Sequence, residues 1–154
     1  MFSFLKKKKV PPSFSIDFPQ ITLSPDTDTL IASLKSSAIE YTLVTDGYII
    51  FAGRTFGCDI PLMFGIHFNV QNIEFIEIFR PQEYYQSASY DIYQSFAQLS
   101  GILRMRYGKP LVTTAASMGG PPGERWYTSD YIVTHDIIDR FGPEEHLQIH
   151  FYKK

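Results

Sequence analysis

Residues 87–110 read SASYDIYQSFAQLSGILRMRYGKP, the only long stretch of the chain with helical periodicity. At about 100° per residue, its apolar side chains fall on one face of a helix and most of its polar side chains fall on the opposite face. The apolar set is Ala88, Ile92, Phe96, Leu99 and Leu103. The pattern predicts a helix of roughly five turns with one face packed on a sheet.

Both ends of this stretch carry the expected signals. Ser87 or Ser89 is expected to be the N-cap, and Asp91 would then lie in the first turn, where the helix dipole favours an anion. Gly108 can adopt the left-handed conformation that ends a helix, and Pro110 cannot continue one.

Strand patterns lie on both sides of the expected helix. A hairpin is predicted from 41–44 and 48–51, because Asp46 and Gly47 accept positive φ in a tight turn. A short helix is expected at 27–36. The remaining expected strands are 14–18, 62–69, 73–79, 111–115, a β region at 126–138, and a last strand that contains Leu147, Ile149 and Phe151. The order predicts an α+β fold: an antiparallel β-sheet, built from a meander plus a C-terminal hairpin, with one long and one short helix packed on one face.

Composition limits the classes of function. The chain has 154 residues, of which 44% are hydrophobic and 16% aromatic, so intrinsic disorder is excluded. A net charge of −2 gives no field that gathers polyanions, so nucleic acid is not an expected partner. We expect a basic flexible tail at 1–12, which holds Lys6 to Lys9, and a single α+β domain at 13–154.

Membrane and redox signals point to one compartment. No run approaches the roughly 18 apolar residues of a membrane span, so stable membrane insertion is not expected. Cys58 is the only cysteine and cannot form an internal disulfide. The expected location is therefore the cytoplasm.

Histidines in the C-terminal hairpin are the first candidates for metal binding. A turn centred between Gly142 and Pro143 would place His135 opposite His150, whereas a slip of one residue would place His135 opposite Ile149. No third ligand follows at a fixed spacing, so we expect these histidines on a solvent-facing strand surface, with neither metal nor cofactor. The loop at 117–123 (SMGGPPG) cannot act as a phosphate loop, because its prolines remove amide donors.

Aromatic and charged residues flank the long helix. Tyr84, Tyr85, Tyr90 and Asp91 precede or begin it, a composition suited to protein recognition. Trp126 is expected to anchor the sheet core under the helix, although tryptophan and arginine are also frequent at interface hot spots.

Three segments together resemble a known class of protein. They are NIEFIEIF (72–79), RYGKP (106–110) and RWYTSDYIV (125–133). This pattern resembles small intracellular bacterial proteins, among them immunity proteins of interbacterial toxin systems. The resemblance implies a stoichiometric binder that occludes a toxin.

The prediction is thus a non-catalytic cytoplasmic protein-binding module whose partner is another protein. The candidate partner contacts are Tyr84, Tyr85, Tyr90, Asp91, Glu124 and Arg125. An alternative is a small enzyme or ligand-binding protein with a cleft near Cys58, His67 and the loop at 117–123. A third is a self-associating structural protein, which would show a mass above 17.7 kDa.

Overall fold

The computed structural model describes residues 10–114 and 119–153. Within them the elements are, in chain order, β1 (Phe14–Ile16), β2 (Ile21–Leu23), α1 (Thr27–Ser36), β3 (Thr42–Thr45), β4 (Tyr48–Gly53), β5 (Leu62–Phe68), β6 (Ile73–Phe79), α2 (Gln82–Tyr85), α3 (Ile92–Tyr107), β7 (Val112–Thr114), β8 (Gly123–Tyr127), β9 (Tyr131–Asp139) and β10 (Pro143–Phe151). The expected basic tail falls largely at residues 1–9, outside the described residues, and so does the start of the loop at 117–123.

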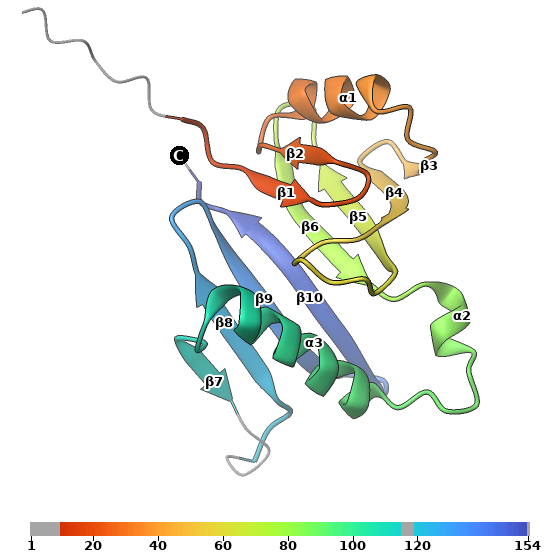
Figure 1. The fold of residues 1–154 in the computed structure, drawn as a ribbon, viewed down its shortest axis with the longest axis vertical. Coiled ribbons are helices and arrows are strands. Elements are labelled where there is room, and N and C mark those ends of the chain that lie inside the picture. The colour runs from red at the N-terminus through yellow and green to blue at the C-terminus, as the bar shows by residue number, and fades with distance from the viewer. Residues whose placement is uncertain (1–9, 115–118, 154) are drawn as a thin grey trace, which may run out of the picture.

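Eight strands form one antiparallel sheet in the order β3-β4-β5-β6-β10-β9-β8-β7. Strands β3 to β6 make a first meander and β7 to β10 a second, each with sequential neighbours paired. The two meanders meet where β6 pairs with β10, with Ile78 opposite Leu147. The predicted α+β class with an antiparallel sheet is confirmed. The strand order places β6, from the middle of the chain, beside β10, the last strand of the sheet in sequence (Figure 1).

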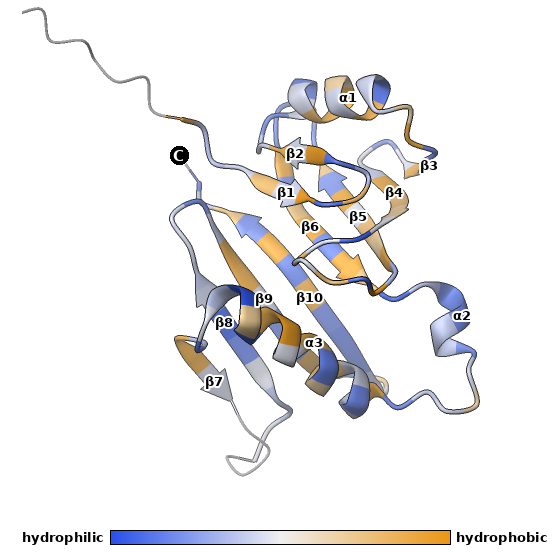
Figure 2. Ribbon diagram, viewed as in Figure 1, coloured by the Kyte–Doolittle hydropathy of each residue, from blue (hydrophilic) through white to orange (hydrophobic). Residues whose placement is uncertain are grey.

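One face of this sheet carries the covering elements. The separate β1–β2 hairpin and α1 lie over the first meander, and α3 lies across the second (Figure 1). Alternate residues along the central strands are buried on this face. The colours of β10 in Figure 2 alternate between hydrophobic and hydrophilic in the same way. We call it the covered face, and the opposite one the outer face. Side chains from both meanders and from the covering elements share one apolar core.

The helix α1 forms as its sequence predicts. Asp26 is the N-cap, and its carboxylate accepts a hydrogen bond from the Thr29 amide at 2.9 Å. Leu30 and Leu34, four residues apart on one helical face, are buried.

The long helix is shorter than expected at its start. It begins at Ile92, and the N-cap is Asp91 rather than Ser87 or Ser89, because the Asp91 carboxylate accepts from the amides of Tyr93 and Gln94 at 2.8 and 3.0 Å. The predicted apolar stripe from Ile92 to Leu103 is buried. The helix ends at Gly108, with φ of 81°, as predicted.

The hairpin between β3 and β4 is present, but its glycine serves another purpose. Gly47 does not adopt positive φ. A Cβ atom there would lie 2.5 Å from the carbonyl oxygen of Phe68, so the close approach of the neighbouring backbone requires glycine.

The register of the C-terminal hairpin corrects the expectation for the histidines. Strands β9 and β10 pair His135 with Leu147 and His150 with Ile132. His135 is fully buried on the covered face, so the prediction that it faces solvent is wrong. Its neighbours at i±2, Val133 and Ile137, are buried on the same face and could have indicated this.

Two further expectations concern Trp126 and membrane insertion. Trp126 is buried, and its indole nitrogen donates to the Gly108 carbonyl at 2.9 Å, which ties β8 to the end of α3. Its predicted core position is confirmed. Among the described residues, no helix has both the length and the apolar character that crossing a bilayer requires.

Candidate functional site

Three of the predicted contact residues come together at the edge of the fold. Tyr84 and Tyr85 lie on α2 and Tyr90 lies just before α3, in the peripheral segment that links β6 to α3 (Figure 1). Their rings meet edge to face, with centroid separations of 5.3 to 6.0 Å. We call these three residues the tyrosine cluster. Mutual edge-to-face packing fixes all three rings before any partner arrives.

Arg80 connects the tyrosine cluster to the interior. Its backbone N–H donates to the Tyr85 hydroxyl at 3.0 Å, and its guanidinium carbon lies 4.5 Å from the Tyr84 ring centroid. The Arg80 residue is only 3% exposed. Burial raises the pKa of Tyr85 and of Tyr90 above the ordinary tyrosine value.

A chain of buried hydrogen bonds continues from Arg80 under α3. The Arg80 Nε donates to Ser95 Oγ at 3.3 Å, and Ser95 Oγ donates to Glu145 Oε2 at 2.5 Å. Glu145 Oε1 lies 2.7 Å from Nε2 of His135, whose Nδ1 lies 3.1 Å from Ser100 Oγ. We call Arg80, Ser95, Ser100, His135 and Glu145 the polar network. A proton on Nε2 satisfies Glu145 and leaves Nδ1 to accept from the serine hydroxyl.

Serine, histidine and glutamate in contact are also the parts of a nucleophilic catalytic triad. Here Ser100 and His135 are 5% and 0% exposed, and the Glu145 side chain is 6% exposed. The ring of Phe96 stacks on His135 at 4.2 Å between centroids. The serine, histidine and glutamate are therefore buried between α3 and the sheet, and their hydrogen bonds position α3 on the sheet.

Glu124 and Arg125, the other predicted contacts, point to opposite faces of β8. The Glu124 side chain is 3% exposed on the covered face, where Oε1 pairs with Arg104 of α3 and Oε2 has no hydrogen-bond partner among the described residues. Arg125 lies on the outer face and donates to Asp136 at 2.6 Å. A buried Glu124 cannot contact a partner, and its parity with Trp126 two residues later could have shown this.

Asp91 is adjacent to the tyrosine cluster. Its carboxylate caps α3, so in this structure it holds the helix start beside the three rings. The site that the structure assembles from the predicted contacts is therefore the tyrosine cluster with Asp91, whereas the polar network behind it was not predicted.

The alternative cleft is not formed among the described residues. Cys58 lies in the loop before β5, and its thiol donates to the Thr55 carbonyl at 3.2 Å. His67 lies near the other end of β5. A strand rises about 3.3 Å per residue, so His67 lies roughly 17 Å from the start of β5, which is the end nearer to Cys58 in sequence. His67 stacks between Tyr48 and Phe75 on the outer face. These residues therefore share no cleft.

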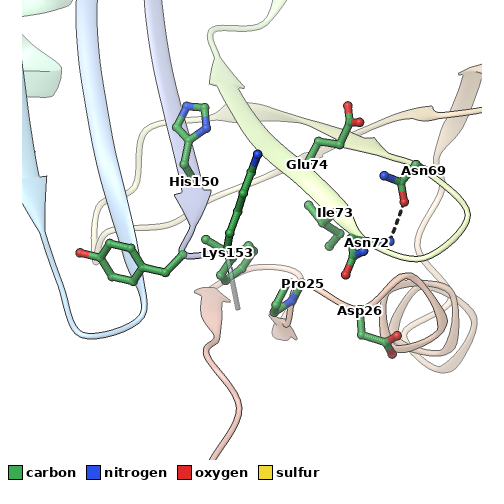
Figure 3. Close-up of a pocket in the computed structure, with 10 residues that line it drawn as sticks. Pro25, Asp26, Asn69, Asn72, Ile73, Glu74, His150 and Lys153 are labelled. Carbon is green, nitrogen blue, oxygen red and sulfur yellow. Dashed lines mark hydrogen bonds between the residues drawn. The ribbon is translucent and has the colours of Figure 1, made fainter.

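The structure contains a different cavity, of about 780 Å³, between the end of β10 and the segments that precede α1 and β6. Its polar side chains do not converge on one point (Figure 3). The interaction drawn there joins Asn69 Oδ1 to the Asn72 amide at 2.8 Å and closes a local turn. Since a ligand site needs a few convergent polar groups, this cavity supports no assignment.

Metal binding and known relatives give no further guidance. Within residues 10–114 and 119–153, no three His, Cys, Asp or Glu side chains are grouped so that they could hold a metal ion. The chain matches no protein-family model, no curated protein and no solved structure.

Proposed function

We propose that this chain is a non-catalytic protein-binding module that binds and occludes a partner protein, as an immunity protein neutralises its cognate toxin. The observation that carries the proposal is the tyrosine cluster: three interlocked rings at the edge of the fold. Tyrosine gives large contact area at low cost in side-chain entropy and is enriched where proteins bind proteins.

Contacts from Arg80 and the polar network hold the tyrosine cluster in one conformation, which favours a partner of complementary shape. Arg80 fixes Tyr84 and Tyr85, and the polar network fixes Arg80 against α3 and β10. A surface held in its bound conformation loses less entropy on association, so it binds more tightly for the same area. The Asp91 carboxylate beside the rings adds negative charge, which suits a partner with basic side chains around an apolar centre.

The proposed compartment is the cytoplasm, where cysteines are kept reduced. Cys58 is a free cysteine. A toxin that enters the same cell would meet its binder there.

Co-expression with the product of the adjacent gene tests the function. We expect a one-to-one complex and survival of cells in which that gene product alone is lethal. Tyr84→Ser and Tyr90→Ser should each weaken the complex by about tenfold or more, as for interface hot spots. Tyr41→Ser, at a tyrosine 48% exposed on a distant segment, is the matched control and should bind as the wild type does.

The possible failures are distinct. Full protection by both tyrosine variants would mean that the contact surface is wrong and the function stands. Absence of a complex together with absence of protection would overturn the function itself.

A further inference from the structure

The outer face of the eight-stranded sheet is left open by every described element. Helices α1 and α3 and the β1–β2 hairpin all pack on the covered face. An antiparallel sheet with one wet face normally alternates apolar residues inward with polar residues outward. This outer face is instead partly apolar, with half-exposed aromatic and aliphatic side chains. They are Tyr48, Ile50, Met63, Phe75, Phe79 and Ile132.

A row of stacked aromatic rings, continued by Ile132 and Tyr127, crosses this face. Tyr48, His67 and Phe75 stack at 4.1 Å between neighbouring centroids, and Phe75 stacks on His150 at 5.6 Å. The cross-strand register continues the row from His150 to Ile132 and on to Tyr127, which is 49% exposed. The row therefore crosses β4, β5, β6, β10, β9 and β8 without a break.

A second, parallel row carries opposite charges at its two ends. Glu77 pairs with Gln148, Gln148 with Thr134, and Thr134 with Arg125. Three strand spacings separate Glu77 from Arg125, about 14 Å at about 4.8 Å per strand. The midpoint of this row lies between β10 and β9, and so does the midpoint between Phe75 and Tyr127 in the aromatic row.

Each charge retains bonding capacity for a second partner. Both hydrogen bonds to Glu77 reach Oε2, from Tyr48 at 3.3 Å and from His67 at 3.4 Å. Both bonds from the Arg125 guanidinium leave from Nη1, to Asp136 and to a backbone carbonyl. Glu77 Oε1 and Arg125 Nη2 can therefore form a further ion pair. Glycine at 65 keeps this region flat, because a Cβ there would lie 2.6 Å from the Tyr48 hydroxyl.

We infer that the outer face binds the outer face of a second copy of this chain, about a two-fold axis parallel to the strands and between β10 and β9. Such an axis exchanges β10 with β9, β6 with β8 and β5 with β7. Glu77 of each copy then faces Arg125 of the other, and Phe75 faces Tyr127. Gln148 faces Thr134. The face is self-complementary in charge and in apolar character, as a two-fold interface must be.

The size of the face suits a dimer. The strands that overlap about this axis are β5, β6, β10, β9, β8 and β7. Six strands at about 4.8 Å and roughly six residues at about 3.3 Å give a flat area of roughly 570 Å². The relief of the side chains raises the accessible area toward the roughly 800 Å² that each partner buries in a specific interface. Two sheets packed about 10 Å apart leave room for extended Glu77 and Arg125 side chains to meet.

The mass in solution gives the first test. Sedimentation equilibrium of the full chain should give twice 17.7 kDa at tens of micromolar. A mass of 17.7 kDa at all concentrations up to about 500 μM would overturn the inference. The inference does not depend on the proposed function, because the tyrosine cluster lies outside the outer face.

Charge reversal gives the second and sharper test. Glu77→Arg and Arg125→Glu each turn both ion pairs of the dimer into like-charge pairs, so each variant alone should dimerise at least about tenfold more weakly. An equimolar mixture of the two variants has both pairs attractive again and should recover the dimer. Recovery on mixing is specific to a two-fold arrangement in which residue 77 faces residue 125.

Controls keep a folding defect apart from a binding defect. Lys35→Glu, at an exposed position on α1, should leave the dimer unchanged. Tyr127→Lys changes an exposed side chain that the fold tolerates and should also yield a monomer, with an unchanged thermal melt of the monomer. A wild-type dimer that resists both charge reversals and Tyr127→Lys would place the interface elsewhere and overturn the inference.

Discussion

The covering elements are held on the two halves of the covered face by different interactions. Over β4, β5 and β6, the β1–β2 hairpin and α1 bury apolar side chains against apolar side chains, as Leu30, Phe51 and Phe64 illustrate. Over β9 and β10, α3 buries the polar network between the main core and a second apolar cluster, which consists of Ile92, Phe96 and Ile137. The first half gains stability from area removed from water, whereas the second half exchanges hydration of charges for specific bonds.

This difference shows where the sequence specifies position rather than stability. Apolar contacts tolerate small shifts, but Ser95 and Ser100 reach Glu145 and His135 only when α3 has one rotation and one height over the sheet. The tyrosine cluster depends on that placement through Arg80. The half under α3, whose polar groups lose the most hydration free energy on burial, is therefore the half that fixes the position of the tyrosine cluster.

Breaking the apolar half should give the largest effect. Phe64 is fully buried and stacks on Phe51 at 5.5 Å between centroids. Phe64→Ala should lower the free energy of unfolding by about 3–5 kcal/mol, because it removes the apolar contact and leaves a cavity. Urea denaturation measures this loss. Phe75→Ala, on the half-exposed outer face, is the control and should cost less than half as much in the monomer; equal losses would contradict the description of the two faces.

A substitution in the polar half should lower the free energy of unfolding nearly as much, because it leaves buried polar groups without partners. Glu145→Ala leaves Ser95 and His135 without their acceptor and Arg80 without the nearby buried charge. The expected loss of unfolding free energy is about 3 kcal/mol.

An apolar replacement of the same network sharpens the contrast. Arg80→Met, His135→Phe and Glu145→Leu combined should cost less than Glu145→Ala alone, because no charge is then left buried without a partner. The two serine hydroxyls can bond to carbonyls of the preceding helical turn. A combined loss larger than that of Glu145→Ala would show that the network adds net stability. In the triple variant the tyrosine cluster should also lose its fixed geometry, which the near-ultraviolet circular dichroism of the tyrosines reports.

The hydrogen bond from Arg80 to Tyr85, which links the polar network to the tyrosine cluster, should contribute less to the free energy of unfolding. Tyr85→Phe removes the hydroxyl that accepts from the Arg80 amide, and the expected loss of unfolding free energy is about 1 kcal/mol. Tyr93→Phe alters a ring that is 57% exposed and should change nothing measurable. If the two variants unfold at the same urea concentration, the Arg80 bond does not stabilise α2.

The smallest expected effect concerns the outer face and depends on pH. Burial, and then the charge of Arg125, lower the pKa of His150 below its ordinary value of 6.5. Below about pH 6.5 the unfolded state therefore binds a proton more readily than the folded state does, so this contribution to stability falls as the pH falls. Urea midpoints at pH 7.5 and 5.5 should differ more for the wild type than for His150→Gln. An unchanged difference would contradict the pKa direction.

The sequence was sufficient where the forces are local. The apolar stripe of α3, the helix α1 and the strand alternation within 62–69 and 73–79 depend on neighbours within a few residues, and all were predicted. The hairpin at Gly47 was predicted, but for another reason. Glycine is required there because the backbone of Phe68 lies too close for a Cβ atom, and not because the turn needs a special backbone conformation.

The sequence was insufficient where partners are remote along the chain. Pairing of β1 with β2 depends on contacts with the sheet below, and the register that buries His135 depends on α3 above it. Ser95 and Ser100 look like ordinary polar residues on a helix until Glu145 and His135 are placed beneath them. The tyrosine cluster was predictable as a composition, whereas its anchoring by Arg80 was not.

The seam between β6 and β10 has a consequence for the order in which the molecule forms. Within each meander the paired strands follow one another in sequence, but β6 meets β10 only after α3 and the whole of the second meander have been synthesised. Contacts between segments so distant in the chain cost the most loop-closure entropy and set the folding rate. During translation the edge of β6 therefore stays unpaired until β10, the last of these eight strands to be synthesised, joins the two meanders.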